Sequence, residues 1–487
     1  STRRGNSTAG SNPALSAETS PRQLAGARAA RSNRSRCMTR TSNVATRFVQ
    51  MAARAGCGGL AYATQHVTQG GGGSVGVVLA IGLLLICGTL AGGILEPLRI
   101  PHLTAYLAVG VIAGPYVARL IERPMVESLQ TVNTLALALI AFAGGAELRI
   151  ADVKRSMRSL SAAAFTQCIL VFVGGAVIFA AVSPFVSFVR GASLAMIAGV
   201  SLLWGVLSIT RSPAATLAIL SQTRAQGPLT TFSLSFVMLS DVLVIVIATT
   251  VIALVKPMLD PSATLSLEVF DHLGHEIIGS VSLGTSLGLL MVLYLRLVNK
   301  QIPVVLVALG FGFTEVVNYV RLDPLLTFLV AGFLIQNLSK QGDKLLHAIE
   351  DMGSVVYVVF FATAGAGLDV PLLRRLWPVA LVLFLGRLLL TVVVNRLSCR
   401  IANDPPVLRR WGWTGLVSQA GVVLGLAISI ARSFPTFGPA FRALAIATVA
   451  LNQLIGPILF KLALDTTGES SRAAEPSRRS LAPPATA

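Results

Sequence analysis

The sequence predicts an all-α polytopic membrane protein with about thirteen transmembrane helices, arranged as two inverted six-helix repeats with paired discontinuous helices. Three observations predict this fold class. Hydrophobic residues make up 54% of the 487 residues and charged residues only 12%, with a mean hydropathy of +0.74, a composition that excludes an ordinary soluble domain. Apolar runs of spanning length recur along most of the chain. These runs form two similar groups on either side of a single run.

The two ends of the chain differ from this apolar region. Residues 1–74 carry ten Arg and one Glu among Ser, Ala, Thr and Gly. This composition is typical of a disordered basic segment, of a transit-type targeting segment or of a false start. Residues 465–487, rich in Ser, Pro and Ala with mixed charges, are predicted to be a disordered carboxyl-terminal tail. The membrane domain is therefore expected at 75–464.

The apolar runs give thirteen expected spans, and the seventh stands alone between two groups of six. In chain order they are 75–94, 101–117, 129–147, 159–183, 193–220, 229–256, 274–296, 300–320, 323–338, 351–369, 374–397, 406–431 and 438–464.

Short matching segments support an internal repeat. The segment that opens the second span of the first group, from Pro101 to Gly110, resembles Pro324 to Gly332 in the second group. The third spans end alike, in Gly145-Ala-Glu-Leu and Gly365-Ala-Gly-Leu. One span between two groups of six reverses the side from which the second group starts, so the repeats are expected to be inverted. Lys and Arg are more frequent in one set of loops, which predicts the amino end of the first span outside.

One carboxylate, Asp241, lies inside the apolar run from Thr230 to Val255. It is eleven residues into that run, about 17 Å deep at a rise of 1.5 Å per residue. An ionisable group at that depth costs at least ~2.5 kcal/mol, so such residues usually bind ions or protons. Packing against a polar partner on a neighbouring helix is the structural alternative.

Two spans are interrupted at corresponding places. The span 193–220 contains Ser208-Ile-Thr-Arg-Ser-Pro213, and the span 406–431 contains Gly415-Leu-Val-Ser-Gln-Ala-Gly421. Proline removes a backbone donor and glycine weakens a helix, so Pro213 and Gly421 are expected to mark helix breaks. Free backbone groups at membrane depth are tolerated only where they line a cavity or are buried in protein. Paired broken helices therefore indicate a transport site.

Two arginines accompany these breaks. Arg387 lies midway along the span 374–397, too deep to reach the interface, and needs an internal partner. Arg211 lies inside the first break, either as a second cation in the site or near a cavity mouth.

Four segments resemble the signatures of the monovalent cation:proton antiporter-2 family, which includes sodium/proton and potassium/proton exchangers with a Kef-like membrane domain. They are Leu98-Arg-Ile-Pro-His-Leu-Thr-Ala-Tyr-Leu-Ala-Val-Gly-Val-Ile-Ala-Gly-Pro115, Phe142-Ala-Gly-Gly-Ala-Glu-Leu148, Gly227-Pro-Leu followed by Leu239-Ser-Asp-Val-Leu243, and Phe360-Phe-Ala-Thr-Ala-Gly365. The resemblance covers about 75–464. It implies the thirteen-helix sodium/proton antiporter fold, a homodimer and alternating access.

The resemblance also implies site residues. Asp241 matches the essential ion-binding Asp of the family. Ser240 stands where members carry Asp, Asn or Gln, and Arg387 matches a basic residue on the facing helix. Arg211 departs from the small polar or acidic residue usual in the first broken helix. The further oxygen ligands expected near Asp241 are Ser240, Thr210, Ser212, Gln419 and the carbonyls around Pro213.

The function expected from these residues is exchange of a monovalent cation, K⁺ or Na⁺, for protons, electroneutral because one carboxylate titrates. Burial favours the protonated carboxyl and a nearby cation favours the carboxylate, so the two ions compete. A cation-coupled organic anion transporter of the same fold is an alternative, since Arg211 and Arg387 could hold a carboxylate. A cation channel is a further alternative, although no filter sequence is present.

No enzymatic constellation, resident metal site, cofactor or nucleic-acid partner is predicted. The chain carries no nucleotide fingerprint, and its five cysteines have no metal-binding spacing. The expected partners are the transported cation, protons, the lipid bilayer and a second copy of the chain. The expected location is the plasma (inner) membrane, or an organelle membrane if 1–74 is a transit peptide.

Overall fold

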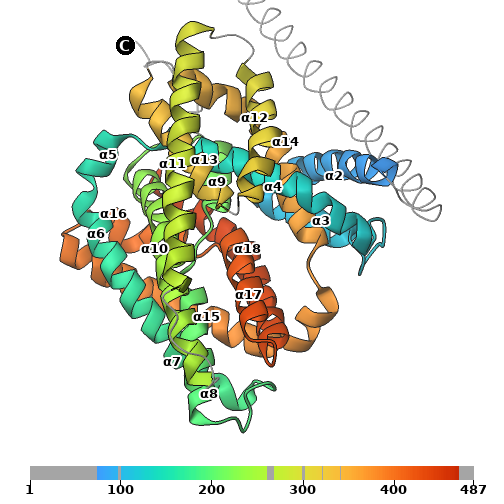
Figure 1. The fold of residues 1–487 in the computed structure, drawn as a ribbon, viewed down its shortest axis with the longest axis vertical. Helices are drawn as coiled ribbons and strands as arrows, with labels where there is room; N and C mark the ends of the chain where they lie inside the picture. The colour runs from blue at the N-terminus through green and yellow to red at the C-terminus, as the bar shows by residue number, and fades with distance from the viewer. Residues whose placement is uncertain are drawn as a thin grey trace, which may run out of the picture. The chain divides into compact units, whose positions relative to one another are not determined.

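The structure, a computed structural model, describes residues 74–96, 100–259, 268–298, 302–320, 322–339 and 342–470. Every regular element within these ranges is helical (Figure 1). Most of the two terminal segments, 1–73 and 471–487, lies outside the described residues, so their expected disorder stays a prediction.

The first half of the described chain contains the helices of the first predicted group. They are α2 (Ser74–Leu95), α3 (His102–Ala113), α4 (Arg123–Glu147), α5 (Ile150–Arg155), α6 (Met157–Thr166), the π-helical turn η2 (Gln167–Val171), α7 (Phe172–Val182), the 3₁₀ turn η3 (Ser183–Phe185), α8 (Leu194–Ile209), α9 (Pro213–Thr223) and α10 (Pro228–Leu259).

The second half follows after one separate helix. The elements are α11 (Glu268–Leu297), then α12 (Ile302–Tyr319), α13 (Pro324–Leu338), α14 (Gly342–Ala366), α15 (Val370–Ala402), α16 (Pro406–Trp411), the 3₁₀ turn η4 (Gly412–Leu416), α17 (Gly421–Ser433) and α18 (Gly438–Thr467).

Each of the thirteen predicted spans corresponds to helix in the structure. Seven helices of the described part are long and apolar enough to cross a membrane, or eight if α16–η4 and α17, bent by 49° at their break, count as one. Four shorter apolar helices, in α3, α4, α13 and α14, and the helix α12 account for the other predicted spans. The fold is therefore that of a polytopic membrane protein with six, one and six helical units.

Local chemistry explains where several helices begin. The side chains of Ser193, Asp323 and Asp369 accept hydrogen bonds from free amides in the first turns of α8, α13 and α15, at 3.3, 2.7 and 3.0 Å. The first backbone amides of a helix have no partner within it, so an oxygen at this position favours helix initiation. These caps set the start of one helix in the first half and two in the second.

The predicted boundaries differ from the structure in two places. The span 101–117 ends as a helix at Ala113, because Gly114 is extended and precedes a proline. The span 159–183 is not a continuous α-helix, because the π-helical turn η2 separates α6 from α7. Such a turn is frequently found at functional sites.

Two helix crossings express the internal repeat. Helix α4 packs on α13, and its counterpart α14 packs on α3. Gly145 faces the carbonyl of Leu329 in the first crossing, and Gly365 faces that of Leu107 in the second. A side chain at either glycine would overlap a backbone carbonyl oxygen. Small residues allow this close backbone approach between membrane helices.

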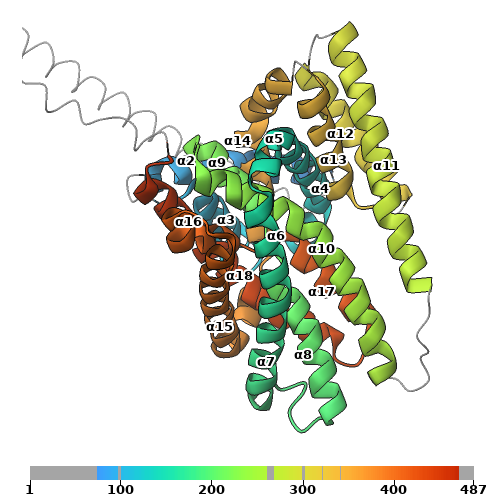
Figure 2. The same cartoon turned by 90° about the vertical axis from the view of Figure 1, so that its left-hand side faces the viewer.

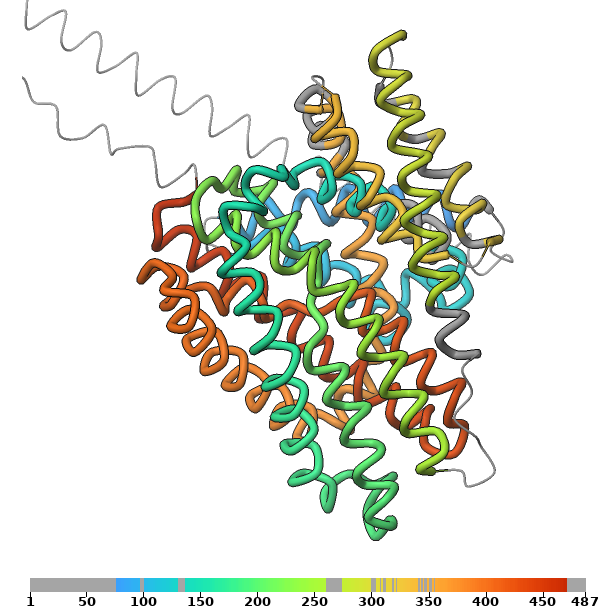
Figure 3. The backbone as a smooth tube through the Cα atoms, turned by 60° about the vertical axis from the view of Figure 1, so that its left-hand side comes forward, coloured from blue at the N-terminus to red at the C-terminus, as the bar shows by residue number. Residues whose placement is uncertain are grey.

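Helices from the two halves pack against one another. Figure 2 shows α7, α8 and α10 side by side, and their contacts agree with that view. In the backbone tube, segments of the second half in orange and red lie among segments of the first half in blue and green (Figure 3). Helix α15 packs on α6 and α7, and α18 packs on α9. The two breaks are thus brought into the same region.

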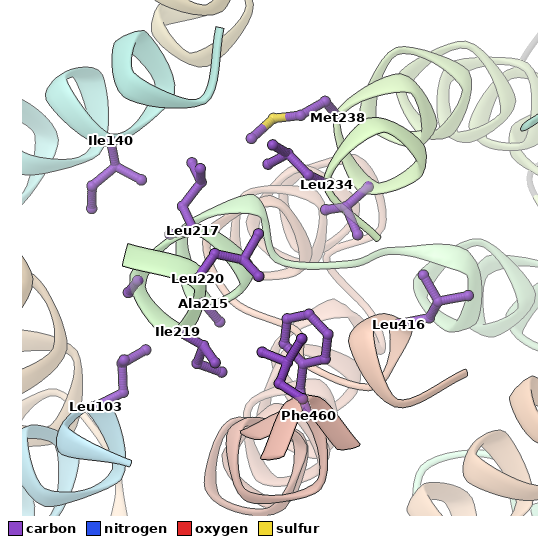
Figure 4. Close-up of a cluster of buried hydrophobic side chains, with 14 of the residues drawn as sticks. Leu103, Ile140, Ala215, Leu217, Ile219, Leu220, Leu234, Met238, Leu416 and Phe460 are labelled. Carbon is purple, nitrogen blue, oxygen red and sulfur yellow. The ribbon is translucent and has the colours of Figure 1, made fainter. Parts of the chain in front are cut away.

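A buried apolar cluster surrounds α9, the second part of the first broken helix. Leu217 and Ile219 of α9 lie at its centre in Figure 4, with Ile140 of α4, Met238 of α10 and Phe460 of α18 around them. All five side chains are buried. Burial of apolar surface holds this short helix in place between elements of both halves.

The predicted tail begins at residue 465, whereas α18 continues to Thr467 and the described chain runs to Ser470. The Glu469 carboxylate accepts hydrogen bonds from the backbone amides of Leu229 and Thr230 and from the Thr230 hydroxyl, each at 2.8 Å. It therefore caps the amino end of α10, where free amides and the helix dipole favour a negative charge. The end of the second half is tied to the helix that carries Asp241.

We expect Gly365→Val to lower the melting temperature of the detergent-purified protein, because the added side chain meets the Leu107 carbonyl. Forced overpacking of this kind typically costs about 1–3 kcal/mol. Gly425→Ala is the matched control, because a Cβ there meets nothing within 4 Å. Equal melting temperatures for Gly365→Val and the parent protein would contradict the close α3–α14 crossing.

Candidate functional site

The two predicted breaks meet at Arg387 of α15. Its guanidinium donates to the carbonyls of Ser208 and Thr210 in the first broken helix, at 2.9 and 2.8 Å. It also donates to the carbonyls of Leu416 and Val417 in the second, at 3.3 and 2.8 Å. Carbonyls at a helix end have no intrahelical partner and lie at the negative end of its dipole. A buried cation with five donors therefore satisfies both ends at once.

Gln419, from the second break, reaches across to the first. Its Nε2 donates to the Leu207 carbonyl at 2.7 Å and to Thr210 Oγ1 at 2.8 Å. Its Oε1 accepts from Asn452 of α18 at 2.9 Å, and Asn452 Oδ1 accepts from Arg387 at 2.8 Å. These side chains are all buried. The crossing is thus closed by a continuous polar network.

Ser212 and Pro213 form the start of α9. The Ser212 hydroxyl accepts from the Ala215 amide at 3.1 Å, and Pro213 occupies the first turn, where its missing N–H costs nothing. Gly421 begins α17 in the same way on the other side of the crossing. The sequence prediction of the two break positions is confirmed to within a few residues.

Asp241 lies near the middle of α10 and is half-buried. Its Oδ1 atom is fully buried and has no hydrogen-bond partner. The charged groups that act on it electrostatically are Asp323, at the start of α13, and Arg211. Ser240, the preceding residue, is buried and its hydroxyl donates to the Val237 carbonyl at 2.8 Å. Adjacent helical residues point in different directions, so Ser240 does not share the Asp241 face.

Arg211 is buried beside the π-helical turn η2. One terminal nitrogen donates to Gln167 Oε1 at 2.8 Å, and the other donates to the Ile209 carbonyl. The guanidinium lies over the Phe236 ring at 4.9 Å from its centroid, a cation–π contact. Its Nε atom has no hydrogen-bond partner. Arg211 thus lies in the site rather than at a cavity mouth.

The structure brings Thr210, Gln419 and Arg387 into direct contact but does not join them to Asp241. Within the described ranges, Asp241 forms neither an ion pair nor a hydrogen bond with Arg387. Arg387 instead binds backbone carbonyls and Asn452. The role expected of Arg387, a direct partner for Asp241, therefore differs from the contacts that it makes here.

Two residues of the network, Asn452 and Gln167, were not identified from the sequence. Asn452 could have been found by aligning Pro228 with Pro439, the prolines in the first turns of α10 and α18, because Asp241 and Asn452 each follow 13 residues later. Gln167 carries no comparable signal, because a neutral polar residue inside an apolar run is common at packed helix surfaces.

A cavity of about 830 Å³ opens at the ends of α4 and α9 and the start of α10. Charged residues of both signs, Glu147, Asp152, Arg149 and Arg224, line it. Its wall extends along α10 as far as Ser235, less than two helical turns before Asp241. The cavity thus approaches the Asp241 region without reaching it.

Comparison with known proteins assigns the family. A family model described as sodium/hydrogen exchanger, transmembrane, matches residues 81–465. No curated protein matches the chain. A structure of the sodium/proton antiporter MjNhaP1 from Methanocaldococcus jannaschii is 17% identical with a TM-score of 0.59, covering 82% of this chain and 98% of that one. A second structure, from an electron-microscopy map of the same protein, is 16% identical with a TM-score of 0.64 and the same coverage.

These findings agree with the resemblance drawn from the sequence motifs. The two structures share the fold with this chain, and the family match spans both broken helices, Asp241 and Arg387. The family and fold are those of transporters. The protein is therefore an integral membrane protein that belongs to the sodium/hydrogen exchanger family of cation:proton antiporters.

Proposed function

We propose that this protein exchanges a monovalent cation, K⁺ or Na⁺, for protons by alternating access, with Asp241 as the shared binding site. The observation that carries the proposal is the Asp241 carboxylate, midway along α10, with one buried oxygen that has no hydrogen-bond partner. Buried polar atoms are normally bonded, and exceptions often serve ion or proton binding. Membership of a cation:proton antiporter family supports the same role.

Further oxygen ligands for the cation are proposed from the residues around the first break. Ser240, Thr210, Ser212 and Gln419 carry side-chain oxygens, and all four are buried. In the conformation described, Thr210 and Gln419 bond each other and Ser212 caps α9. Binding of a dehydrated cation would therefore require some of these hydrogen bonds to open, which suits a site that changes between states.

The carboxylate itself determines the exchange. Desolvation favours its neutral form, whereas a bound cation favours its ionised form, so proton and cation exclude one another. Because no second carboxylate adjoins Asp241 at position 240, one charge crosses in each direction. Arg211 and Arg387 contribute fixed positive charge, since arginine stays protonated.

The alternative of organic anion transport rests on Arg211, whose buried Nε has no partner. The two terminal nitrogens of that guanidinium already bind Gln167 and a backbone carbonyl. Arg387 is fully engaged by carbonyls and Asn452. Neither arginine presents the pair of free donors that a carboxylate substrate binds best, so cation exchange is the better supported function.

Three wider expectations belong to the same proposal. We propose a homodimer in the plasma (inner) membrane, or in an organelle membrane if 1–74 is a transit peptide. We also propose that the amino end of the membrane domain lies outside and its carboxyl end inside, as the loop charges predict. Cysteine labelling that placed Lys154 and the residues after Leu464 on opposite sides of the membrane would contradict this orientation.

Asp241→Asn is expected to abolish exchange of Na⁺ and K⁺ for protons, because the amide neither ionises nor balances the charge of a cation. The measurement is proton flux in proteoliposomes that contain the purified variant, with each cation offered in turn. Its melting temperature should stay near or above that of the parent, since a buried charge is removed. Wild-type exchange by folded Asp241→Asn would disprove the proposed site.

Exchange is expected to be electroneutral, one cation for one proton, because a single carboxylate titrates. Proteoliposomes with an imposed membrane potential should show no steady transport current and an unchanged cation gradient at equilibrium. A current that follows the imposed potential would show that charge crosses in each cycle and would refute the stoichiometry.

Arg387→Ala is expected to destabilise the protein strongly, because four backbone carbonyls and Asn452 would lose their donor. Removing one partner of a buried charged hydrogen-bond network typically costs about 3–5 kcal/mol. Arg387→Lys keeps the charge but offers three donors in place of five, so an intermediate melting temperature is expected. Parent-like melting temperatures for both variants would show that the crossing does not depend on this guanidinium.

A further inference from the structure

Two sets of three side chains occupy equivalent places in the two halves. The first triad is Gln167, Arg211 and Asp241, and the second triad is Arg387, Gln419 and Asn452. Each triad takes one residue from the helix before a break, one from the break itself and one from the last helix of its half. The comparison of the two triads gives information that neither half gives alone.

The break residues correspond by their position at a helix start. Ser212 is the N-cap of α9, and Ala420 is the N-cap of α17. Arg211 and Gln419 each immediately precede these caps. A charged residue in the first half thus stands where the second half has a neutral amide.

The other two pairs correspond by sequence offset. Asp241 and Asn452 each lie 13 residues after the proline of the first turn of their helices. Gln167 and Arg387 are separated by 220 residues, which is also the separation of Gly145 and Gly365 at the equivalent helix crossings. The first triad therefore carries two opposite charges, and the second carries one.

Hydrogen bonding distinguishes the triads sharply. In the second triad, Asn452 binds Gln419 at 2.9 Å and Arg387 at 2.8 Å, and every side-chain nitrogen and oxygen has a partner. In the first triad only Arg211 and Gln167 are joined, at 2.8 Å. Arg211 Nε, Gln167 Nε2 and Asp241 Oδ1 are all buried without a partner. The second triad is closed and the first is open.

The open triad holds complementary groups. Two of its unpartnered atoms are donors and the third is a carboxylate oxygen that accepts. Arg211 and Asp241 already attract each other electrostatically at their present separation. Since inverted repeats build equivalent sites from the same helix arrangement, the closed contact of the second half defines an arrangement that the first half can also adopt.

We propose that Arg211 is an internal counter-cation for Asp241, which closes the first triad when Asp241 carries neither a proton nor a substrate cation. In that state the Arg211 guanidinium donates to the Asp241 carboxylate, as the Asn452 amide joins Gln419 and Arg387 in the second half. Arg211 then competes with K⁺ or Na⁺ for the carboxylate and so sets the affinity for the cation. This inference rests on the proposed role of Asp241 as the exchange site.

The first test separates KM from kcat in proteoliposomes with Na⁺ and with K⁺. Arg211→Gln removes the charge, keeps an amide that can bond Gln167 and reproduces the residue of the second half. Its KM for the cation is expected to fall roughly tenfold, the effect of removing one contact between coupled charged groups. Arg211→Lys keeps a competing charge and should stay within about threefold of the parent, and Arg442→Gln, on an exposed part of α18, is the control.

The second test measures cation binding without transport. The purified protein is heated in detergent in a buffer whose only cation is bulky choline, and again with NaCl or KCl added. A ligand that binds the folded state raises the melting temperature according to its affinity. The rise should be larger for Arg211→Gln than for the parent and absent for Asp241→Asn. An unchanged or smaller rise, together with an unchanged or higher KM for folded Arg211→Gln, would overturn the counter-cation.

The two proposals fail in different ways. If Asp241→Asn still exchanges cations at the parental rate, the proposed function is wrong and the role of Arg211 falls with it. If Asp241→Asn is inactive but Arg211→Gln leaves both KM and the thermal shift unchanged, only the counter-cation is wrong. Should Arg211→Gln fail to fold, Arg211→Lys and the double variant with Asp241→Asn supply the comparison. Restored folding in the double variant would support the pair, and its absence would count against it.

Discussion

The architecture depends on one arginine that satisfies two broken helices. Each break leaves carbonyl groups without intrahelical partners, and hydrocarbon offers no donor to replace them. Arg387 donates to carbonyls of both breaks, from Ser208 and Thr210 on one side and Leu416 and Val417 on the other. A lysine with three donors could not match this set. Without such a group, two interrupted helices crossing inside a membrane protein would carry a large desolvation penalty.

The two halves use the same geometry for different chemistry. In the second half, the neutral amides of Gln419 and Asn452 complete the network around Arg387, so that half is fully bonded. In the first half the equivalent positions carry Arg211 and Asp241, and buried atoms of both lack partners. Fully satisfied polar networks rigidify a core, whereas a partly satisfied one retains groups that can change partners. We infer that the second half supports the crossing and the first half holds the exchangeable ions.

The surrounding helices position these groups by close packing. Gly145 and Gly365 allow α4 to approach α13 and α14 to approach α3, and any larger residue would meet a backbone carbonyl. Glu469 caps the amino end of α10 and ties the end of the second half to the helix that carries Asp241. The position of Asp241 therefore depends on contacts at both ends of the chain's membrane domain. Sequence repeats, packing and the candidate ion site are linked through these few contacts.

The sequence by itself determined the features that depend on neighbouring residues. Apolar runs located the helices, Pro213 and Gly421 located the two breaks, and the position of Asp241 within its run placed a carboxylate deep in α10. Only the tertiary structure decided which groups satisfy one another. The partners of Arg387, the part played by Asn452 and the contact between Arg211 and Gln167 all join segments far apart in the chain, up to 212 residues for Gln419 and Leu207. Such contacts depend on the angle and register at which helices cross, which long-range packing sets and local sequence patterns do not contain.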